Sequence, residues 1–268
     1  MVVHLLGTGA AEGVPALYSG SRVSQYAREH GGKDVRTRSA ALIDGALKID
    51  LGPDTLMQSH RDHLDPRDWS GVIFTHGDDD HCSPRELQYG LYPFNEMEYL
   101  GFTLYGNDRV CDRIRSTYPD WPIECVQTRS FEAFQHAEFV VTPIEANHNR
   151  KEDCQNHIIQ RAGKALLYAT DTGVWRAPTW NFLKDFRLDA LVIECTEGLC
   201  ATGFDGHLDL FECAEVVARL RAQGSLNPKA RVVTTHHSHL GNATHGELTK
   251  ALAPHGIEPG FDGMVFEL

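Results

Sequence analysis

Two histidines and three aspartates fall within six consecutive positions of the chain, and side chains of these types bind metal ions. Residues 75–81 read T-H-G-D-D-D-H, and they directly follow the apolar run Val72-Ile73-Phe74. Carboxylates this close together repel one another unless a cation lies among them. A solvated acidic loop is the plain alternative. The flanking histidines and the apolar run before them favour a metal site at the end of a strand.

Four more polar side chains stand at similar places along the chain. His148, Asp171 and His236 each follow a predicted strand, and His207 lies in a loop before a predicted helix. Each of them alone would be an ordinary cap or turn residue. Strand ends on one edge of a sandwich can converge, so together these residues are predicted to meet the cluster at 76–81.

Composition and charge narrow the class of protein. The chain has 268 residues, with 41% hydrophobic and 23% charged side chains, which is typical of a soluble globular protein. We find no repeat or linker and predict one domain over residues 1–268. The net charge of −12 disfavours nucleic acid and anionic membranes as partners. A phosphorylated substrate remains open, because bound cations would reverse the local potential.

Cysteine usage and the apolar segments indicate the compartment. The seven cysteines are odd in number, scattered and without a CxxC pair, which argues against a disulfide framework. No apolar run is long enough to cross a bilayer, and the first residues, Met1-Val2-Val3-His4, read as a strand. The expected location is therefore a reducing cytoplasm.

The elements that must position these side chains alternate between hairpins and strand–helix units. Strands are predicted at 2–6, 39–43, 46–51, 72–75, 102–105, 139–144, 156–161, 165–169, 190–194, 232–235 and 264–267. Helices are predicted at 53–63, 84–90, 108–117, 208–222 and 245–253, with Ser83 as the cap of the second. Residues 16–38 are expected to be irregular. The order repeats in the two halves, so the fold class is α/β (α+β), a four-layer αββα sandwich.

These motifs resemble those of the metallo-β-lactamase superfamily. The metal-binding pattern near residue 76, followed by His, Asp and His at strand ends, matches the order of that family. The flanks, from Gly7-Thr8-Gly9 to the His236 motif, look most like the PhnP type of cyclic-phosphate phosphodiesterase, with tRNase Z as a more distant relative. The similarity covers nearly the whole chain and is more specific for fold than for substrate.

The resemblance implies two metal sites and a proton donor. One site would use His76, Asp78 and His148, the other Asp80, His81 and His236, and Asp171 would bridge them. His207 matches a histidine that contacts the scissile phosphate or protonates the leaving group. Asp50 matches an aspartate that supports a metal ligand from behind.

The chain departs from this family pattern at two places. Asp78 stands where the family has its second histidine, and a carboxylate there favours manganese or iron relative to a nitrogen-rich zinc site. Zinc stays possible as well. Ser19, Ser21 and Ser24 stand where the PhnP type has the cysteines of a structural zinc site, with His239 as its remaining ligand. Serine hydroxyls bind zinc poorly, so we predict no structural zinc.

The expected function is hydrolysis of a small phosphodiester, cyclic ones included, by a dinuclear centre that activates a bridging hydroxide. Alternatives with the same centre are hydrolysis of an ester, thioester or lactone, oxygen reduction by two iron ions, and metal binding without turnover. The expected partner is a small phosphorylated substrate, without nucleic acid or membrane, and a homodimer is possible.

Overall fold

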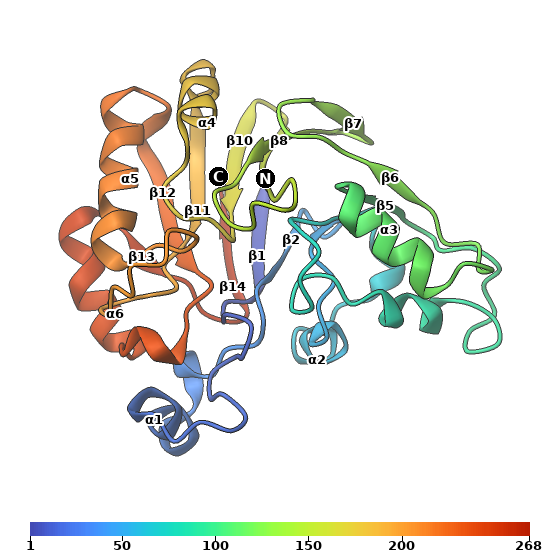
Figure 1. Ribbon diagram of the computed structural model, residues 1–268, viewed down its shortest axis with the longest axis horizontal. Coiled ribbons are helices and arrows are strands. Elements are labelled where there is room, and N and C mark those ends of the chain that lie inside the picture. Colours follow the sequence, from blue (N-terminus) through green and yellow to red (C-terminus); the bar gives the residue numbers. More distant parts are fainter.

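Two seven-stranded mixed sheets pack face to face in the computed structural model, which describes residues 1–268 (Figure 1). The first sheet has the order β14-β1-β2-β3-β4-β5-β6, and the second has the order β13-β12-β11-β10-β9-β8-β7. The strands of the first sheet are β1 (Val2–Gly7), β2 (Ala40–Ile43), β3 (Leu47–Ile49), β4 (Gly71–Ile73), β5 (Thr103–Gly106), β6 (Cys125–Gln127) and β14 (Met264–Glu267). Those of the second are β7 (Phe134–His136), β8 (Phe139–Glu145), β9 (Gln155–Arg161), β10 (Lys164–Ala169), β11 (Leu188–Glu194), β12 (Leu226–Thr235) and β13 (Glu258–Pro259).

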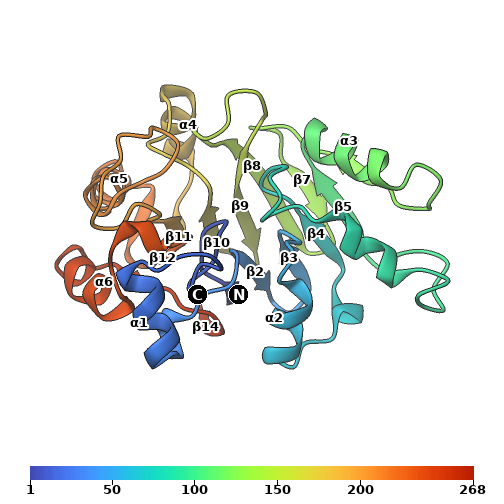
Figure 2. The ribbon, with the colours of Figure 1, turned by 60° about the horizontal axis from the view of Figure 1, so that its bottom comes forward.

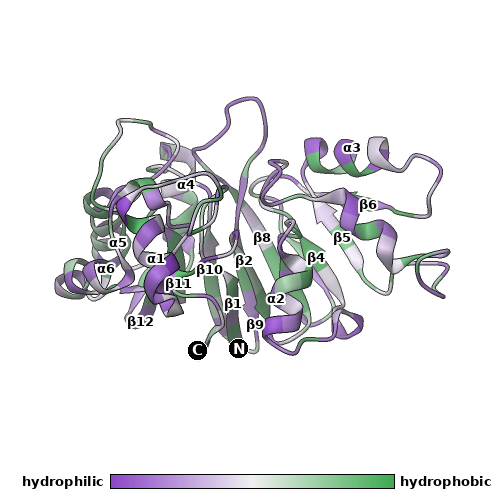
Figure 3. Ribbon diagram, turned by 90° about the horizontal axis from the view of Figure 1, so that it is seen from below, coloured by the Kyte–Doolittle hydropathy of each residue, from purple (hydrophilic) through white to green (hydrophobic).

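Apolar side chains from the two sheets interdigitate between them. Ile43 and Ile49 of the first sheet belong to the same buried cluster as Leu166 and Tyr168 of the second. Colouring by hydropathy shows this interior as green strands beneath more polar helices and loops (Figure 3). Burying this apolar surface is the main stabilising contribution to the sandwich.

Helices cover both outer faces and make the outer layers. These are α1 (Arg22–His30), α2 (Thr55–Arg61), α3 (Asp108–Thr117), α4 (Ala177–Phe182), α5 (Leu210–Ala222) and α6 (His245–Leu252). A second core lies between α4, α5, α6 and the second sheet, and a third lies between α3 and the first sheet. Figure 2 shows both helical layers outside the strands. The predicted αββα sandwich is confirmed.

Several predicted elements are wrong. Residues 16–38 are not irregular throughout, because they contain α1, whose N-cap Ser21 accepts a hydrogen bond from the amide of Ser24. Residues 84–90 form a 3₁₀ helix, and Ser83 makes no side-chain capping bond. The prediction missed β6, β7, β13 and α4. It correctly placed the hairpin at Asp44-Gly45, which joins β2 to β3.

Parallel strand pairs bring distant loops to one edge of the sandwich. β3 and β4 are parallel, and so are β10, β11 and β12. β8 runs in the same direction as β10, because both are antiparallel to β9. The loops after β4, β8, β10, β11 and β12 therefore leave at corresponding strand ends, where the predicted metal ligands lie. None of the helices is both long and apolar enough to span a membrane.

Candidate metal centre

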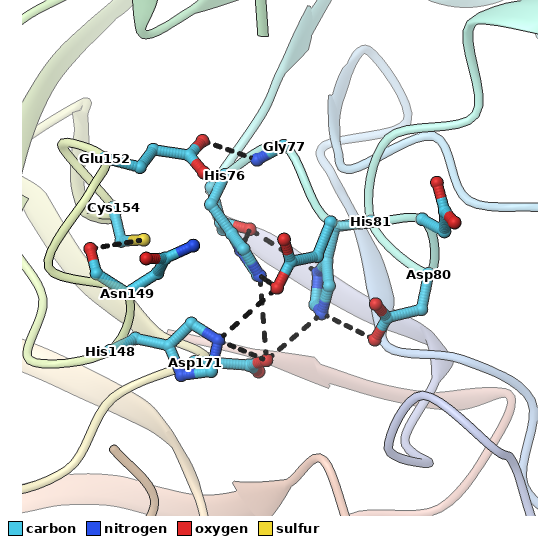
Figure 4. A network of polar contacts seen from close by, with 12 residues as sticks. His76, Gly77, Asp80, His81, His148, Asn149, Glu152, Cys154 and Asp171 are labelled. Atoms are coloured by element: carbon cyan, nitrogen blue, oxygen red, sulfur yellow. Dashed lines mark hydrogen bonds and ion pairs between the residues drawn. The ribbon is translucent and has the colours of Figure 1, made fainter. Parts of the chain in front are cut away.

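The seven predicted metal ligands converge at this edge of the sandwich. Figure 4 shows His76, Asp80, His81, His148 and Asp171 pointing toward one another. The ligand atoms of His76, His148 and Asp171 lie within 4.8 Å of one another. A second group with the same spacing contains Asp80, His81, Asp171 and His236. Asp171 belongs to both groups.

Asp78 completes the first group. Its Oδ2 lies 3.5 Å from Nε2 of His76 and 3.6 Å from Nε2 of His148. Two imidazoles and one carboxylate thus face a common point, with Asp171 beside them. The first group offers more oxygen character than a site made of histidines alone.

Buried polar atoms without partners show that this donor set fits metal ions. Nε2 of His76, His81 and His236 and Oδ2 of Asp80 are buried and accept or donate no hydrogen bond. Such atoms are rare in folded proteins, since leaving them unpaired is unfavourable. A cation at the centre of each group would satisfy all four atoms.

The aspartates hold positive charge on neighbouring histidines. The imidazoles of His148 and His76, both within 3.6 Å, lower the pKa of Asp78 below its usual range. Burial disfavours charge on His148, but its contact with Asp78 raises its pKa to about 9. Burial opposes charge on His236 as well, and Asp171 raises its pKa to about 10. Because histidine must lose its proton to bind a metal ion, cations here would replace these protons.

Asp50 supports the centre from behind. Its carboxylate, at the end of β3, lies 2.7 Å from Nδ1 of His81 and accepts the amide of Thr75 at 2.8 Å. The first contact fixes the ring so that Nε2 of His81 faces the cluster. Asp50 and His236 both have left-handed backbones, with φ of 58° and 55°. Non-glycine residues in this region are strained and are often found at functional sites.

Glu194, at the end of β11, is a central residue that the sequence analysis missed. It is fully buried, and its carboxylate lies 2.9 Å from Nδ1 of His207. Thr196 donates to the same carboxylate at 2.5 Å and lies 2.8 Å from Nδ1 of His236. One carboxylate therefore orients both His207 and His236. The strand-end pattern that identified Asp171 applies equally to Glu194 and could have found it.

His207 faces the cluster with its remaining ring nitrogen. Its ring centroid lies 5.0 Å from that of His148 and 5.5 Å from that of His236. Burial disfavours charge on His207, but Glu194 outweighs it and raises the pKa. His207 thus lies beside the predicted metal ligands with Nδ1 engaged by Glu194 and Nε2 without a hydrogen bond.

The loop that carries His76–His81 is also braced from outside. Glu152 accepts the amide of Gly77 at 2.6 Å, and Arg109 of α3 lies 3.1 Å from the same carboxylate. Arg113, one turn further along α3, donates to the carbonyl of Gly77 and pairs with Asp79. Asp79 is the aspartate of the cluster that points away from the centre, with its side chain 90% exposed.

A cavity of about 330 Å³ opens beside the cluster. Its lining includes the metal-binding residues Asp78, Asp80, His148, Asp171 and His236, together with His207. Phe204, Leu240 and Glu12 are further along the lining. The cavity is large enough for a small molecule that reaches the metal ligands and His207 together.

The serine cluster near α1 is held by hydrogen bonds. Ser21 Oγ lies 2.9 Å, and Ser19 Oγ 3.3 Å, from Nδ1 of His239. Ser24 Oγ accepts the amide of Ala16 instead. The hydroxyls and His239 satisfy one another, in line with the predicted lack of a structural zinc, which stays a prediction.

Comparisons with known proteins agree with this arrangement. The family model described as "Beta-lactamase superfamily domain" matches residues 47–237. Zinc-bound PqqB from Methylobacterium extorquens has a TM-score of 0.78 and 18% identity, with all of both chains covered. A diphosphatase of the PhnP family has a TM-score of 0.77 and 20% identity, and the match covers all of this chain and 97% of the other. The short form of human tRNase Z has a TM-score of 0.68 and 19% identity, and the match covers 100% of this chain and 99% of the other. No curated protein matches the chain.

Proposed function

Because the chain belongs to the beta-lactamase superfamily, we propose that it is a metal-dependent hydrolase that cleaves a small phosphodiester at a dinuclear centre. The observation that carries the proposal is the convergence of seven metal-binding side chains, four of whose buried atoms form no hydrogen bond. A PhnP-family diphosphatase and tRNase Z are among its structural neighbours, and at this low identity they support the fold rather than the substrate.

Each residue has a separate role in the proposed reaction. His76, Asp78 and His148 would hold one divalent ion, Asp80, His81 and His236 the other, and Asp171 would contact both. Manganese and zinc both suit this donor set, and iron does as well. Such ions supply Lewis acidity toward a phosphoryl group and lower the pKa of water. The protein contributes the fixed ligand geometry and the walls of the cavity.

His207 donates the proton that the departing alkoxide needs. Glu194 engages Nδ1, so the proton available to a substrate in the cavity is on Nε2. This carboxylate also favours the protonated ring, which is the form that a general acid requires.

The leaving group distinguishes this role from a purely structural one. Glu194→Gln should lower kcat about 100-fold for a methyl phosphodiester, because methoxide leaves only with a proton. The loss should be much smaller for bis(p-nitrophenyl) phosphate, since nitrophenolate leaves unprotonated. Equal losses on both substrates would contradict proton donation by His207.

Substrate profiling tests the proposed function as a whole. Protein loaded with manganese or zinc should hydrolyse bis(p-nitrophenyl) phosphate or a cyclic phosphate, and Asp171→Asn should abolish the activity. Hydrolysis of thioesters or lactones without any phosphodiester activity would instead support the alternative hydrolase.

An iron-dependent oxidation is a second candidate, favoured by one observation. His76, His148 and Asp78 form a set of two histidines and one carboxylate, an arrangement typical of non-haem iron sites. The test is iron content after purification without added metal, together with oxygen consumption by the iron-loaded protein. Iron with oxygen uptake and no hydrolysis would favour this candidate.

A further inference from the structure

The cavity beside the metal ligands has an unusual charge for a site that takes an anion. Its lining contains no lysine and no arginine. Glu12 and Glu197 add two carboxylates to those of the metal ligands. All positive charge for binding a phosphate must therefore come from the metal ions and from His207.

The expected charge balance at the centre favours a substrate with one negative charge. Two divalent ions among Asp78, Asp80 and Asp171 leave a single net positive charge, and a metal-bound hydroxide would cancel it. A phosphodiester, with one negative charge, suits this balance better than a more highly charged anion. A second anionic group elsewhere on the substrate would approach Glu12 and Glu197, with no lysine or arginine in the lining to offset their charge.

Glu197 and Glu12 differ in how many of their carboxylate oxygens already accept hydrogen bonds. Both oxygens of Glu197 are used, since they accept the amide and the hydroxyl of Thr202 and so hold the loop after β11. Glu12 accepts one hydrogen bond, from Ser238, and its side chain stays 32% exposed. His239, 3.6 Å away, is the only basic side chain in ion-pair range of Glu12. Glu12 is thus available to a ligand in the cavity.

An exposed aromatic ring lines the same cavity. Phe204 is 52% exposed and its ring centroid lies 5.5 Å from that of His207. Leu240, also in the lining, is 67% exposed. A carboxylate combined with an accessible aromatic face is a suitable environment for an alkylammonium group, which is attracted to both.

We propose that the cavity selects phosphate esters whose organic group is cationic and apolar, with Glu12 as its counter-charge and Phe204 as its aromatic contact. The proposal rests on the proposed function and specifies its substrate class. Glu12 and Phe204 then determine specificity, while the metal ligands and His207 act on the phosphoryl group.

Two isosteric ligands test the charge preference by calorimetry on the manganese-loaded protein. Phosphocholine and 3,3-dimethylbutyl phosphate are phosphate monoesters, so a phosphodiesterase does not turn them over, and their phosphate groups carry the same charge. They have the same shape and differ only in a quaternary nitrogen in place of a carbon. Wild type should bind phosphocholine about fivefold more tightly. Glu12→Gln should remove most of this preference. Glu29→Gln, which removes the same charge from an exposed position of α1, should retain it.

Phe204→Leu provides a second variant, which keeps apolar contact and removes the aromatic face, so the preference should shrink without disappearing. Equal affinities in wild type, or a preference that survives Glu12→Gln, would overturn the proposal. Hydrolysis of bis(p-nitrophenyl) phosphate by the same preparation distinguishes failure of the proposed selectivity from failure of the proposed phosphodiesterase activity. Turnover with equal affinities refutes only the selectivity, whereas a preference without turnover supports the selectivity and contradicts the phosphodiesterase.

Discussion

Asp78 is the residue that we expect to influence most which metal the protein selects. Its carboxylate faces the same point as His76 and His148, where a histidine would give a more nitrogen-rich site. Carboxylate oxygen is harder than imidazole nitrogen, so it shifts preference from zinc toward manganese or iron. It also adds a negative charge that lowers the net charge of the loaded centre.

Exchanging this residue should change the metal content. Asp78→His should raise the proportion of zinc relative to manganese and iron in protein purified without added metal. Asp79→His is the matched control, because Asp79 is in the same loop but 90% exposed and paired with Arg113. Elemental analysis of both variants gives the answer, and an unchanged zinc proportion in Asp78→His would contradict the assignment.

The residues of the candidate centre could be predicted from the sequence because each is marked by its immediate neighbours in the chain. His76 to His81 are contiguous, and His148, Asp171 and His236 each follow a predicted strand. Glu194 obeys the same pattern and was missed because a single glutamate after a strand suggests nothing about a partner. Glu152 could not be found, since its contact with Gly77 depends on how two loops meet in three dimensions.

Among the elements, β3 carries a charged residue into the core. Lys48 is completely buried, and its Nζ donates to the backbone carbonyl of Asp50 at 2.5 Å. Burial lowers the pKa of Lys48 to about 7. The lysine thereby fixes the backbone of the residue that orients His81, at the expense of an unfavourable environment for its charge.

This burial makes stability depend on pH above neutrality. The folded-state pKa of Lys48 lies below that of an unfolded lysine, so between about pH 7 and 10 the unfolded chain binds more protons. The free energy of unfolding should therefore rise with pH in this window, by about 1 kcal/mol per pH unit from Lys48.

Lys48→Met should lack this contribution, and urea denaturation at several pH values measures it. The stability advantage of Lys48→Met over wild type should be greatest near pH 7 and decrease toward pH 10. Lys250→Met, at an exposed position of α6, controls for loss of a surface charge. A pH-independent difference would show that Lys48 is charged in the folded protein throughout.

The segment around α1 shows why some elements escape sequence analysis. The helix is only nine residues long, and few of them are buried: Val23, Ser24 and Ala27. It depends on tertiary contacts, such as Arg28 donating to the carbonyls of Ser19 and Ala16. The edge strands β6, β7 and β13 have two or three residues each and are defined by pairing rather than by a pattern in their own sequence.

Replacing the serines near His239 tests whether hydroxyls alone prevent zinc binding. Ser19 and Ser21 already contact Nδ1 of His239, and Ser24 is on the first turn of α1, whose N-cap is Ser21. The triple variant Ser19→Cys, Ser21→Cys, Ser24→Cys should gain one zinc ion per chain, because thiolates are strong zinc ligands. The corresponding variant with alanines should gain none. An unchanged zinc content in the cysteine variant would show that the backbone here cannot form the site.

At the scale of the whole molecule, the candidate centre joins the two sheets. His76 to His81 follow β4 of the first sheet, whereas His148, Asp171 and His236 follow β8, β10 and β12 of the second. Ions bound there would connect both halves and stabilise the folded state over the unfolded chain. The αββα order could be predicted because each half alternates clear hydrophobic strands with longer helices, and the parallel pairings then determine where the loops meet.

The metal stoichiometry of the intact chain tests the central claim most directly. After dialysis against buffered manganese or zinc and removal of the excess, elemental analysis should find two ions per chain. Asp171→Asn should hold at most one, because Asp171 belongs to both groups of ligands. A wild-type chain that keeps the αββα fold and retains no divalent ion would contradict the account.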